Sequence, residues 1–512
     1  MWVVSARESA ERDRATIENG TPSRVLMQRA GIAAAAEIVR RYDHRLKDGV
    51  VVFTGPGNNG GDGWVVAGTL AQSDVSVTVV EIGKPDAGKS PDAYAEREAA
   101  LPRVSVTTGV PQNAGVVVDA LLGTGFEGEP RAGIATAISR VNEMRQRGSV
   151  VAALDVPSGL NATNGQHSNC VVADLTTSFG GIKRGTLLAR DCCGEIVAVD
   201  IGLDENGHGG VESAHRLPAL IDGAWVSARV PSIRYDAHKG TRRHLAIIGA
   251  GSGMPGAVVL AARAALRSGI GLVRTMVAPE NTGAVLSAVP SALNSSWPMA
   301  DQVKSEIASW ADAIVIGPGL GKSREARDLV GRILRASNLP VLLDADALNI
   351  FAGDTDSLAK LLRGKRALLT PHVAEFARLM NTKAEQVIEN RFDIGTELAQ
   401  KVGAIVLLKG APTVIFSPNG ERYVVARGNA ALGTGGSGDI LAGIAGTLLA
   451  QMGDAVDAAA CAAWIHGRAA ELCEFVRGTT LEDVLYALPR AWNEREQIPA
   501  APVMAVLPAV AA

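Results

Sequence analysis

The sequence predicts an α/β protein of two domains, each built on a mainly parallel sheet with helices on both faces. Short apolar runs alternate with helical segments along most of the chain. Such continuous runs are typical of parallel strands, which are buried on both faces. The 57 glycines exceed the usual share of ~7% and favour tight loops. A length of 512 residues allows about three domains of roughly 150 residues, and two large α/β domains fit equally well.

In the first half of the chain, the longest expected helix has an apolar stripe and becomes basic toward its end, as helix C-termini favour. A glycine-rich loop follows the first strand and precedes the next helix. The expected elements are a helix at 24–47, a strand at 50–53, a helix at 64–71, strands at 75–82 and 116–119, a helix at 133–145 and a strand at 150–155.

A second unit is expected to begin near His238 and to repeat the alternation. Its elements are a strand at 244–248, a helix at 257–267, strands at 313–316, 341–344, 367–370, 404–409 and 413–416, and a small-residue helix at 439–452. Residues 203–232 combine glycine, proline and scattered charge with weak periodicity, which predicts a domain junction. We therefore expect domains at 1–215 and 225–495, followed by an Ala/Pro-rich, disordered tail at 496–512.

Charge and composition exclude several classes of protein. A net charge of −3, from 50 basic and 53 acidic residues, argues against partners such as nucleic acid or an anionic membrane. The five cysteines are odd in number and show no zinc-ligand spacing, which favours a reducing compartment. The N-terminus does not resemble a signal peptide, and the apolar run at 440–452 is too short to span a bilayer. A cytoplasmic protein is expected, and the low charge content favours a homo-oligomer.

The most conspicuous motif is the segment 55–63, Gly-Pro-Gly-Asn-Asn-Gly-Gly-Asp-Gly, between a strand and a helix. Its glycines allow close approach of a ligand to the backbone, and the following helix N-terminus offers free N–H groups to an anion. Its asparagines and aspartate add oxygen ligands. A tight structural turn is the alternative, but nine residues of this composition are hard to explain in that way.

Two further strand ends carry oxygen groups, because Asp119 and Asp155 each close an apolar run. The carboxyl ends of parallel strands meet at one edge, where ligands bind. Asn59, Asp119 and Ser158 could therefore bind a hard cation, leaving Asp155 for acid–base chemistry. Helix capping would explain any one of these residues, but explains the set less easily.

Together with Phe-Gly-Gly-Ile-Lys-Arg-Gly at 179–185, these motifs resemble the NAD(P)H-hydrate epimerase domain over roughly residues 5–205. The resemblance implies a Rossmann-like fold, a potassium ion at Asn59, Asp119 and Ser158, and Asp155 as the acid–base residue. Lys183 is expected to face the substrate as a second catalytic candidate, since Lys183 or water could serve in place of Asp155; a solvated lysine is the alternative. The implied substrate contacts are Asn58, Asn59, Gly60, Gly61, Asp62, Gly123, Thr124, Gly125, Phe126, Glu127, Gly128, Glu129 and Asp155.

The second half carries a different set of motifs. They are His-Lys-Gly at 238–240, Gly-Pro-Gly-Leu-Gly at 317–321, Leu-Asp-Ala-Asp-Ala-Leu-Asn at 343–349, Thr-Pro-His at 370–372, Lys-Gly-Ala-Pro-Thr at 409–413 and Gly-Thr-Gly-Gly-Ser-Gly-Asp at 433–439. The last is the most informative, because glycines at a helix N-terminus present N–H groups to a transferring phosphoryl group. Asp439 then stands where a carboxylate could accept a hydroxyl proton.

These motifs resemble the ribokinase-like superfamily, and within it NAD(P)H-hydrate dehydratase, over roughly residues 225–490. The resemblance implies that ADP or ATP, with Mg²⁺, phosphorylates the ring hydroxyl of an NADH or NADPH hydrate and that phosphate then leaves. His372 could instead be a structural histidine near a helix N-cap. The implied hydrate contacts are Ala257, Gly319, His372 and Asp439, and the implied nucleotide contacts are Lys409, Gly410, Ala411, Pro412, Thr413, Gly435, Gly436, Ser437 and Gly438.

Two motifs match other nucleotide-binding patterns only in their letters. Residues 83–90 fit GxxxxGK[ST], but Pro91 lacks the N–H that a phosphate would need, and Asp86 and Asp92 would repel a triphosphate. Residues 251–256 fit GxGxxG, but Pro255 interrupts the motif and no acidic residue follows about 20 positions later.

Two alternatives from other functional classes stay open at this point. The second domain could be a vitamin or sugar kinase that releases a stable phosphoester. The first domain could bind a nucleotide-like ligand without turnover, as a regulatory module. Since hydration of NAD(P)H gives two epimers and the dehydratase accepts one, a fused epimerase would supply it from the other. This shared metabolite favours hydrate repair.

Overall fold

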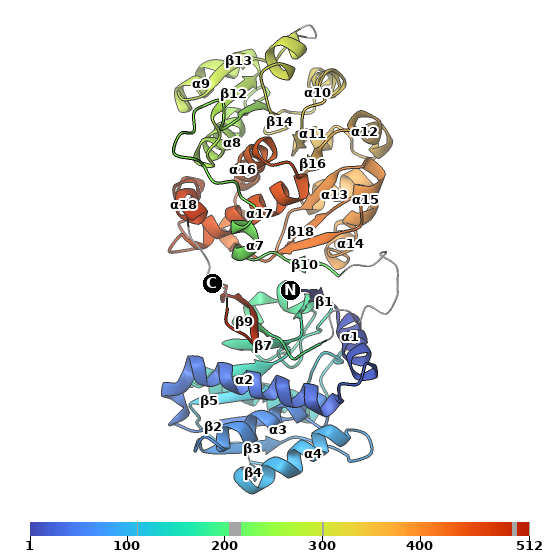
Figure 1. Ribbon diagram of the computed structural model, residues 1–512, viewed down its shortest axis with the longest axis vertical. Helices are drawn as coiled ribbons and strands as arrows, with labels where there is room; N and C mark the ends of the chain where they lie inside the picture. The colour runs from blue at the N-terminus through green and yellow to red at the C-terminus, as the bar shows by residue number, and fades with distance from the viewer. Residues whose placement is uncertain (110, 204–216, 300–301, 494–498, 511–512) are drawn as a thin grey trace. The chain divides into compact units, whose positions relative to one another are not determined.

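The computed structural model describes residues 1–109, 111–203, 217–299, 302–493 and 499–510. Its contacts divide the chain into two compact units, Met1–Ser213 with Ile498–Val510, and Ala214–Gln497 (Figure 1). Each unit has its own sheet, so the α/β class predicted from the sequence is confirmed.

Unit 1 contains an eight-stranded sheet in the order β20-β9-β7-β6-β5-β2-β3-β4. Every pair is parallel except β20 with β9. The strands, in sheet order, are Val503–Leu507, Glu195–Val199, Leu175–Phe179, Val150–Leu154, Val116–Ala120, Val50–Thr54, Val77–Glu81 and Ser105–Thr107. Short strands β1 (Val3–Val4) and β8 (Ile182–Lys183) form a separate parallel pair.

Helices cover both faces of this sheet because successive residues of each strand point to opposite sides. Val50 and Val52 of β2 pack with helices α2 (Ser23–Leu46) and α3 (Asn58–Ala71), whereas Val51 and Phe53 pack with α5 (Ala132–Gln146). All four side chains are almost fully buried. The strand therefore reads as a continuous apolar run rather than an alternating one. The other helices of the unit are α1 (Ala6–Glu18), α4 (Pro91–Ala100) and α6 (Arg184–Leu188).

The predicted glycine-rich loop is shorter than expected. Helix α3 begins at Asn58, so most of the segment 55–63 forms its first two turns rather than a loop. Glycine is required there by close packing. A Cβ on Gly60 would lie 2.0 Å from the Gly55 carbonyl oxygen, and one on Gly63 would lie 2.5 Å from the Ala120 Cβ. Packing against the strand ends thus overrides the low helix propensity of glycine.

The expectation of a disordered tail is wrong for the segment that forms β20. Val503–Leu507 pairs antiparallel with β9, and Ala505 and Leu507 are buried. The tail is apolar enough to cover the edge of the sheet, and its backbone groups satisfy those of β9. Composition alone did not predict this strand, because alanine and proline are also common in disordered segments.

Unit 2 contains a ten-stranded sheet in the order β10-β19-β18-β17-β16-β15-β14-β11-β12-β13. Only β18 runs antiparallel to its two neighbours. The strands, in sheet order, are Ala219–Leu220, Arg422–Val425, Thr413–Phe416, Ile405–Leu408, Ala367–Leu369, Val341–Leu343, Ala313–Ile316, His244–Ile248, Leu272–Val277 and Leu293–Ser296. The five central strands from β17 to β11 are parallel, so their carboxyl ends share one edge.

Helices α8 (Pro255–Arg267), α16 (Ser437–Gln451), α17 (Ala455–Glu471) and α18 (Leu481–Asn493) bury an alanine-rich core against one face of this sheet. Figure 1 shows α12, α13 and α15 on the other side of the sheet. Small side chains bring α16 close to α8, because a Cβ on Gly443 would lie 2.1 Å from the Ala261 carbonyl oxygen. The remaining helices are α7 (Gly223–Ser227), α9 (Thr282–Ala288), α10 (Arg324–Ala336), α11 (Asp346–Asn349), α12 (Thr355–Leu362), α13 (Val373–Met380), α14 (Ala384–Glu389) and α15 (Gly395–Val402).

Across the described ranges, none of the helices combines the length and the apolar character that crossing a membrane requires.

The role of β20 gives a first prediction. Leu507→Asp places an unpaired charge at a position that is 5% exposed, whereas Val510→Asp changes a position that is 39% exposed. We expect Leu507→Asp to lower the free energy of unfolding of unit 1 by about 2 kcal/mol or more, because a buried charge has no partner there. Thermal unfolding measures the difference. Equal melting temperatures for the two variants would contradict the docking of β20.

Candidate active sites

The carboxyl edge of the unit 1 sheet brings together the three residues predicted to bind a cation. The Ser158 hydroxyl donates to Asp119 Oδ1 at 2.6 Å, and its backbone N–H donates to Asp119 Oδ2 at 2.7 Å. Asn59, in the first turn of α3, donates through Nδ2 to the Leu122 carbonyl oxygen at 2.7 Å. The Leu122 N–H in turn donates to Ser158 Oγ at 2.9 Å. The result is a compact cluster of oxygen atoms from three strand ends.

Two features of this cluster suit a cation with a preference for oxygen. The Oδ1 atom of Asn59 is buried and, among the described residues, meets no hydrogen-bond donor. Burial raises the pKa of Asp119 to about 6, although the bonds from Ser158 and Leu121 oppose this shift. A nearby positive charge would stabilise both the orphaned oxygen and the buried carboxylate. The donor set therefore fits a hard monovalent or divalent cation.

Asp155 follows β6 at the same edge and forms a buried ion pair with Lys183. The Lys183 ammonium also donates to the carbonyl oxygens of Phe179 at 2.7 Å and Gly181 at 3.3 Å. Asp155 has a φ of 65°, and its Oδ1 accepts the Phe179 N–H at 2.9 Å. The alternative of a solvated Lys183 is wrong, because only 1% of its side chain is exposed. Its charge is held in place beside the carboxylate.

The carboxyl groups of Asp62 and Asp13 interact electrostatically with this ion pair. Burial raises the pKa of Asp62 well above its ordinary value, and the charges of Asp155 and Asp13 raise it further, whereas Lys183 lowers it. Burial also raises the pKa of Asp13, with Lys183 opposing this shift. Asp62 was expected from the glycine-rich motif. Asp13, from helix α1, was missed, because nothing in its local sequence indicates that it faces a strand end far along the chain.

The loop after β5 carries the remaining predicted contacts of unit 1. Gly123 lies against α3, since a Cβ there would be 3.2 Å from the Asn59 Cβ. Farther along the loop, Glu127, Gly128 and Glu129 are exposed, and Glu129 accepts a hydrogen bond from Ser168 at 2.6 Å. The structure thus brings the near end of the loop to the cation cluster and leaves its far end at the surface.

In unit 2, the central feature of the sheet edge is a buried ion pair. Asp344 directly follows β15, and Lys409 directly follows β17. The Lys409 ammonium donates to Asp344 Oδ1 at 2.8 Å, and the Thr370 hydroxyl donates to the same oxygen at 2.8 Å. Glu375 Oε2 lies 3.7 Å from the ammonium. Burial opposes the charge of Lys409, but Asp344 and Glu375 outweigh it, so the pKa of Lys409 is raised.

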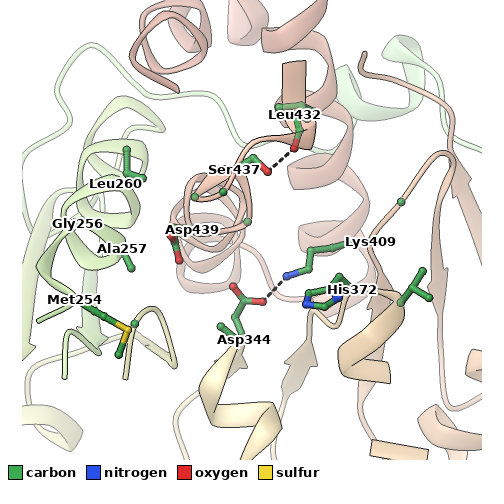
Figure 2. Close-up of a pocket in the computed structure, with 17 residues that line it drawn as sticks. Met254, Gly256, Ala257, Leu260, Asp344, His372, Lys409, Leu432, Ser437 and Asp439 are labelled. Carbon is green, nitrogen blue, oxygen red and sulfur yellow. Dashed lines mark hydrogen bonds and ion pairs between the residues drawn. The ribbon is translucent and has the colours of Figure 1, made fainter. Parts of the chain in front are cut away.

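Asp439 lies in the first turn of α16, beside this ion pair. Gly436 forms the N-cap of the helix with a φ of 102°, so a side chain would be strained there. Burial raises the pKa of Asp439 to about 7, and Asp344 and Glu375 add to the shift while Lys409 opposes it. Figure 2 shows the Asp439 and Asp344 carboxylates reaching into the same space. This carboxylate can therefore exchange a proton near neutral pH.

A cavity of about 880 Å³ opens over these groups. One wall is the start of α8, another is the glycine-rich N-terminus of α16, and the floor is the strand edge with Asp344 and Lys409 (Figure 2). The sequence-predicted residues that line it are Ala257, Gly319, His372, Lys409, Gly410, Gly435, Gly436, Ser437, Gly438 and Asp439. Its volume suits a nucleotide-sized ligand.

Glycine at position 438 keeps the cavity open at its charged end. A Cβ there would lie 3.3 Å from Lys409 Nζ and 3.9 Å from Asp344 Oδ2. The Ser437 hydroxyl donates to the Leu432 carbonyl oxygen at 2.7 Å, which fixes the start of the helix. At the start of the helix, the Ser437 N–H donates to the Thr434 carbonyl oxygen at 3.2 Å and the Asp439 N–H to the Gly436 carbonyl oxygen at 3.0 Å. Among the described residues, the glycine N–H groups at 435, 436 and 438 are therefore the ones left to bind an anion in the cavity.

His372 is a helix cap, as one of the two interpretations expected, and it also lies at the cavity. Its Nδ1 accepts the Ala374 N–H at 3.1 Å and caps α13, while the ring also lines the cavity. Burial lowers the pKa of His372, and Lys409 lowers it further against the effect of Glu375. A neutral imidazole can contact a ligand without adding charge.

Other expected contacts lie farther out. Ala411, Pro412 and Thr413 are absent from the residues that line the cavity. Their loop is held from behind, since Arg391 donates to the Pro412 carbonyl oxygen at 3.1 Å.

Some charged residues at this site were missed from the sequence. Asp344 belongs to a quoted motif but received no role, and Glu375 stands three residues after His372 in the helical capping pattern. His466 on α17 is also buried, with an Nε2 atom that meets no partner in the described part of the chain. Burial lowers its pKa to about 4, and Lys409 contributes. No local pattern marks His466, because it is a single histidine in an alanine-rich helix.

The two misleading motifs have different outcomes. In residues 83–90, Asp86 Oδ1 accepts the N–H groups of Gly88 and Lys89, each at 3.0 Å. These amides are thus used within the loop rather than free for a phosphate. In residues 251–256, Met254 and Gly256 line the unit 2 cavity. That glycine-rich segment therefore forms part of the wall of the cavity that Asp439 also lines.

Comparison with known proteins identifies the family. Residues 245–489 match the NAD(P)H-hydrate dehydratase family, and residues 23–185 match the family described as the YjeF-related protein N-terminus. A bifunctional NAD(P)H-hydrate repair enzyme from Coxiella burnetii is 36% identical over 471 residues, which cover 91% of this chain and 93% of that protein. The chain belongs to the bifunctional NAD(P)H-hydrate repair enzyme family. The relative from Escherichia coli is 33% identical over 96% of this chain and 94% of its own length.

A solved structure supports the fold of unit 2. The ADP/ATP-dependent NAD(P)H-hydrate dehydratase from Bacillus subtilis, co-crystallised with ATP and Mg²⁺, is 28% identical and superposes with a TM-score of 0.50. It covers 55% of this chain and 99% of that one. Together with the bifunctional relatives, this match favours hydrate repair over the vitamin or sugar kinase alternative.

Proposed function

We propose that the region 225–495 dehydrates NAD(P)H hydrates with ADP or ATP as the phosphoryl donor, and that the region 1–215 interconverts the two hydrate epimers. The observation that carries the first assignment is Asp439, a carboxylate with a pKa near 7 at a glycine-rich helix N-terminus. Family membership supports both assignments. The homo-oligomer and the cytoplasmic location stay predictions from composition.

Proton transfer to Asp439 begins the dehydration. As the C6 hydroxyl of the hydrate loses its proton to this carboxylate, its oxygen forms a bond to the terminal phosphorus of the donor. The bond between that phosphorus and the leaving oxygen breaks, releasing AMP from ADP or ADP from ATP. The C6–O bond then breaks, phosphate leaves with the electron pair, and loss of the C5 proton restores the ring double bond.

The charges around Asp439 fit the phosphoryl donor. The N–H groups of Gly435, Gly436 and Gly438 and the Lys409 ammonium would stabilise the developing negative charge without reorganising, since these residues line the cavity. The Asp344 carboxylate is a hard oxygen donor of the kind that Mg²⁺ prefers. A bound Mg²⁺ would supply positive charge that offsets the phosphates. Ala257, Gly319 and His372 line the remaining wall, where we place the hydrate.

In unit 1, we assign Asp155 as the group that moves a proton at C6 of the hydrate. Lys183 compensates its charge from the buried side and holds its orientation through the Phe179 and Gly181 carbonyls. Lys183 is thus a positioning residue in this account. The first turn of α3 and the loop at 123–129 would hold the dinucleotide.

We further propose that the cluster of Asn59, Asp119 and Ser158 binds potassium. The orphaned Asn59 Oδ1 supports this assignment, because it is a buried oxygen with a free lone pair. A bound K⁺ would supply positive charge beside the buried Asp119 carboxylate.

The central prediction of the proposed function concerns Asp439→Asn. We expect this variant to lose dehydration by about 10²- to 10⁴-fold, because asparagine cannot accept the hydroxyl proton, while epimerisation continues. The assay uses a mixed-epimer NADH hydrate with K⁺, Mg²⁺ and ADP or ATP. Recovery of reduced-nicotinamide absorbance and release of phosphate are followed together.

The control is Asp356→Asn, which removes an exposed carboxylate from the same unit. Loss of activity is separated from unfolding by the melting temperature at pH 8. The folded pKa of Asp439 is raised, so its ionisation destabilises the fold as pH rises from about 4 to about 7. Asp439→Asn should therefore melt no lower than the wild type at pH 8. Dehydration near the wild-type rate would show that Asp439 is not the base.

Potassium binding is tested through stability. Replacing Na⁺ with K⁺ should raise the melting temperature of unit 1, because a ligand that binds only the folded state stabilises that state. The expected gain in the free energy of unfolding is about 1–3 kcal/mol. Asn59→Ala should remove this K⁺-dependent shift. Asn58→Ala, at the exposed neighbouring position, should keep it. The same shift in Asn59→Ala and in the wild type would refute the potassium site.

A further inference from the structure

Three metal-ligating side chains of unit 1 converge outside the cation cluster and the Asp155 site. His167 and Cys170 lie in the segment between β6 and β7, and Cys192 lies in the short turn after α6. The Cys170 and Cys192 sulfur atoms are 3.3 Å apart, and Cys192 Sγ is 3.7 Å from His167 Nε2. The ligand atoms of all three residues lie within 4.8 Å of one another.

The spacing of these atoms suits one tetrahedral ion. With Zn–S bonds of ~2.3 Å and a Zn–N bond of ~2.0 Å, ligand atoms around zinc are roughly 3.5–3.8 Å apart. The observed sulfur–sulfur and sulfur–nitrogen distances lie close to this range. Only small side-chain adjustments would be needed to place all three atoms around a central ion.

Backbone hydrogen bonds hold the two thiols in position. The Asn142 side chain donates to the Cys170 carbonyl oxygen at 2.9 Å and accepts the Val172 N–H at 2.9 Å. The Ala173 N–H donates to the Cys192 carbonyl oxygen at 2.9 Å. Cys170 and Cys192 are buried, whereas His167 is exposed. The cluster therefore has a rigid inner side and an open outer side.

We propose that His167, Cys170 and Cys192 form a binding site for a thiophilic divalent cation, with Zn²⁺ as its preferred occupant and solvent as the fourth ligand. Two thiolates and a neutral imidazole balance the charge of the ion. Sulfur and imidazole ligands select zinc over the potassium and magnesium of the other two sites. This site does not depend on the proposed function of either unit.

Binding of a divalent cation must displace the protons of both thiols, so the affinity should rise with pH. Sequence spacing missed the site because Cys192 lies 22 residues after Cys170.

Occupation of the site would stiffen the segment that carries Ser158. The Val171 N–H, next to Cys170, donates to the Ser158 carbonyl oxygen at 2.9 Å. The zinc ligands and the oxygen cluster are thus joined by one backbone hydrogen bond, and zinc should raise the melting temperature of unit 1 as well as bind.

The test uses the full chain, stripped with a chelator and kept reduced by a phosphine. Titration with Co²⁺ should give one equivalent per chain and a thiolate-to-cobalt absorption band that Zn²⁺ removes. Cys170→Ser and Cys192→Ser should each weaken binding by at least about 100-fold, since loss of a ligand costs more than loss of an outer partner. His167→Ala changes an exposed residue, so it should weaken binding while the metal-free melting temperature stays unchanged.

Cys193→Ser is the matched control, because its buried thiol points to the Ala189 carbonyl oxygen at 3.3 Å rather than to the cluster. It should bind Co²⁺ as the wild type does. The proposal is overturned if no thiolate band forms, or if the band persists in Cys170→Ser or Cys192→Ser. It is also overturned if the chain, purified without a reductant, exposes two fewer thiols than its five cysteines on denaturation, because a disulfide would then occupy the site.

Discussion

The ion pair between Lys409 and Asp344 is the interaction on which the unit 2 site depends. Both groups follow parallel strands, and because Asp344 is buried and Lys409 is mostly buried, water stabilises their charges only weakly. Pairing compensates them, and Thr370 satisfies the same carboxylate oxygen. Because the pair is fixed, the nearby Asp439 meets a second carboxylate and an ammonium at once. Its raised pKa follows from burial and from this balance of charges.

In unit 1, a different ion pair compensates charge at the edge of the sheet. Asp155 and Lys183 meet at the carboxyl edge of the sheet, and backbone carbonyls take up the rest of the ammonium. A separate oxygen-rich cluster around Asp119 includes an Asn59 amide oxygen that meets no donor in the described part of the chain. In both units, parallel strands bring charged residues from distant parts of the sequence to one edge. The sheet thus determines which groups can interact, and burial then determines how strongly.

Much of this could be predicted from sequence where a local pattern carries the signal. Continuous apolar runs predicted the central strands, and the glycines before Asp439 predicted the start of α16. The oxygen ligands at the ends of β5 and β6 were predicted to converge, and Ser158 does bond to Asp119. The prediction of convergence was correct because the parallel direction of the strands alone places their carboxyl ends together. The segment 55–63 was only partly understood, since its packing against Ala120 makes it helical.

What could not be predicted depends on contacts between distant segments. Asp13, His466 and the partners of Cys170 have no local pattern, and β20 was mistaken for a disordered tail because only pairing with β9 orders it.

The proposed dehydration depends most on Asp439. The most direct test is NMR titration of its carboxyl carbon in ¹³C-aspartate-labelled protein, with Asp439→Asn to assign the resonance. The account predicts a midpoint at about 7. A midpoint near the ordinary value of ~4 would contradict it.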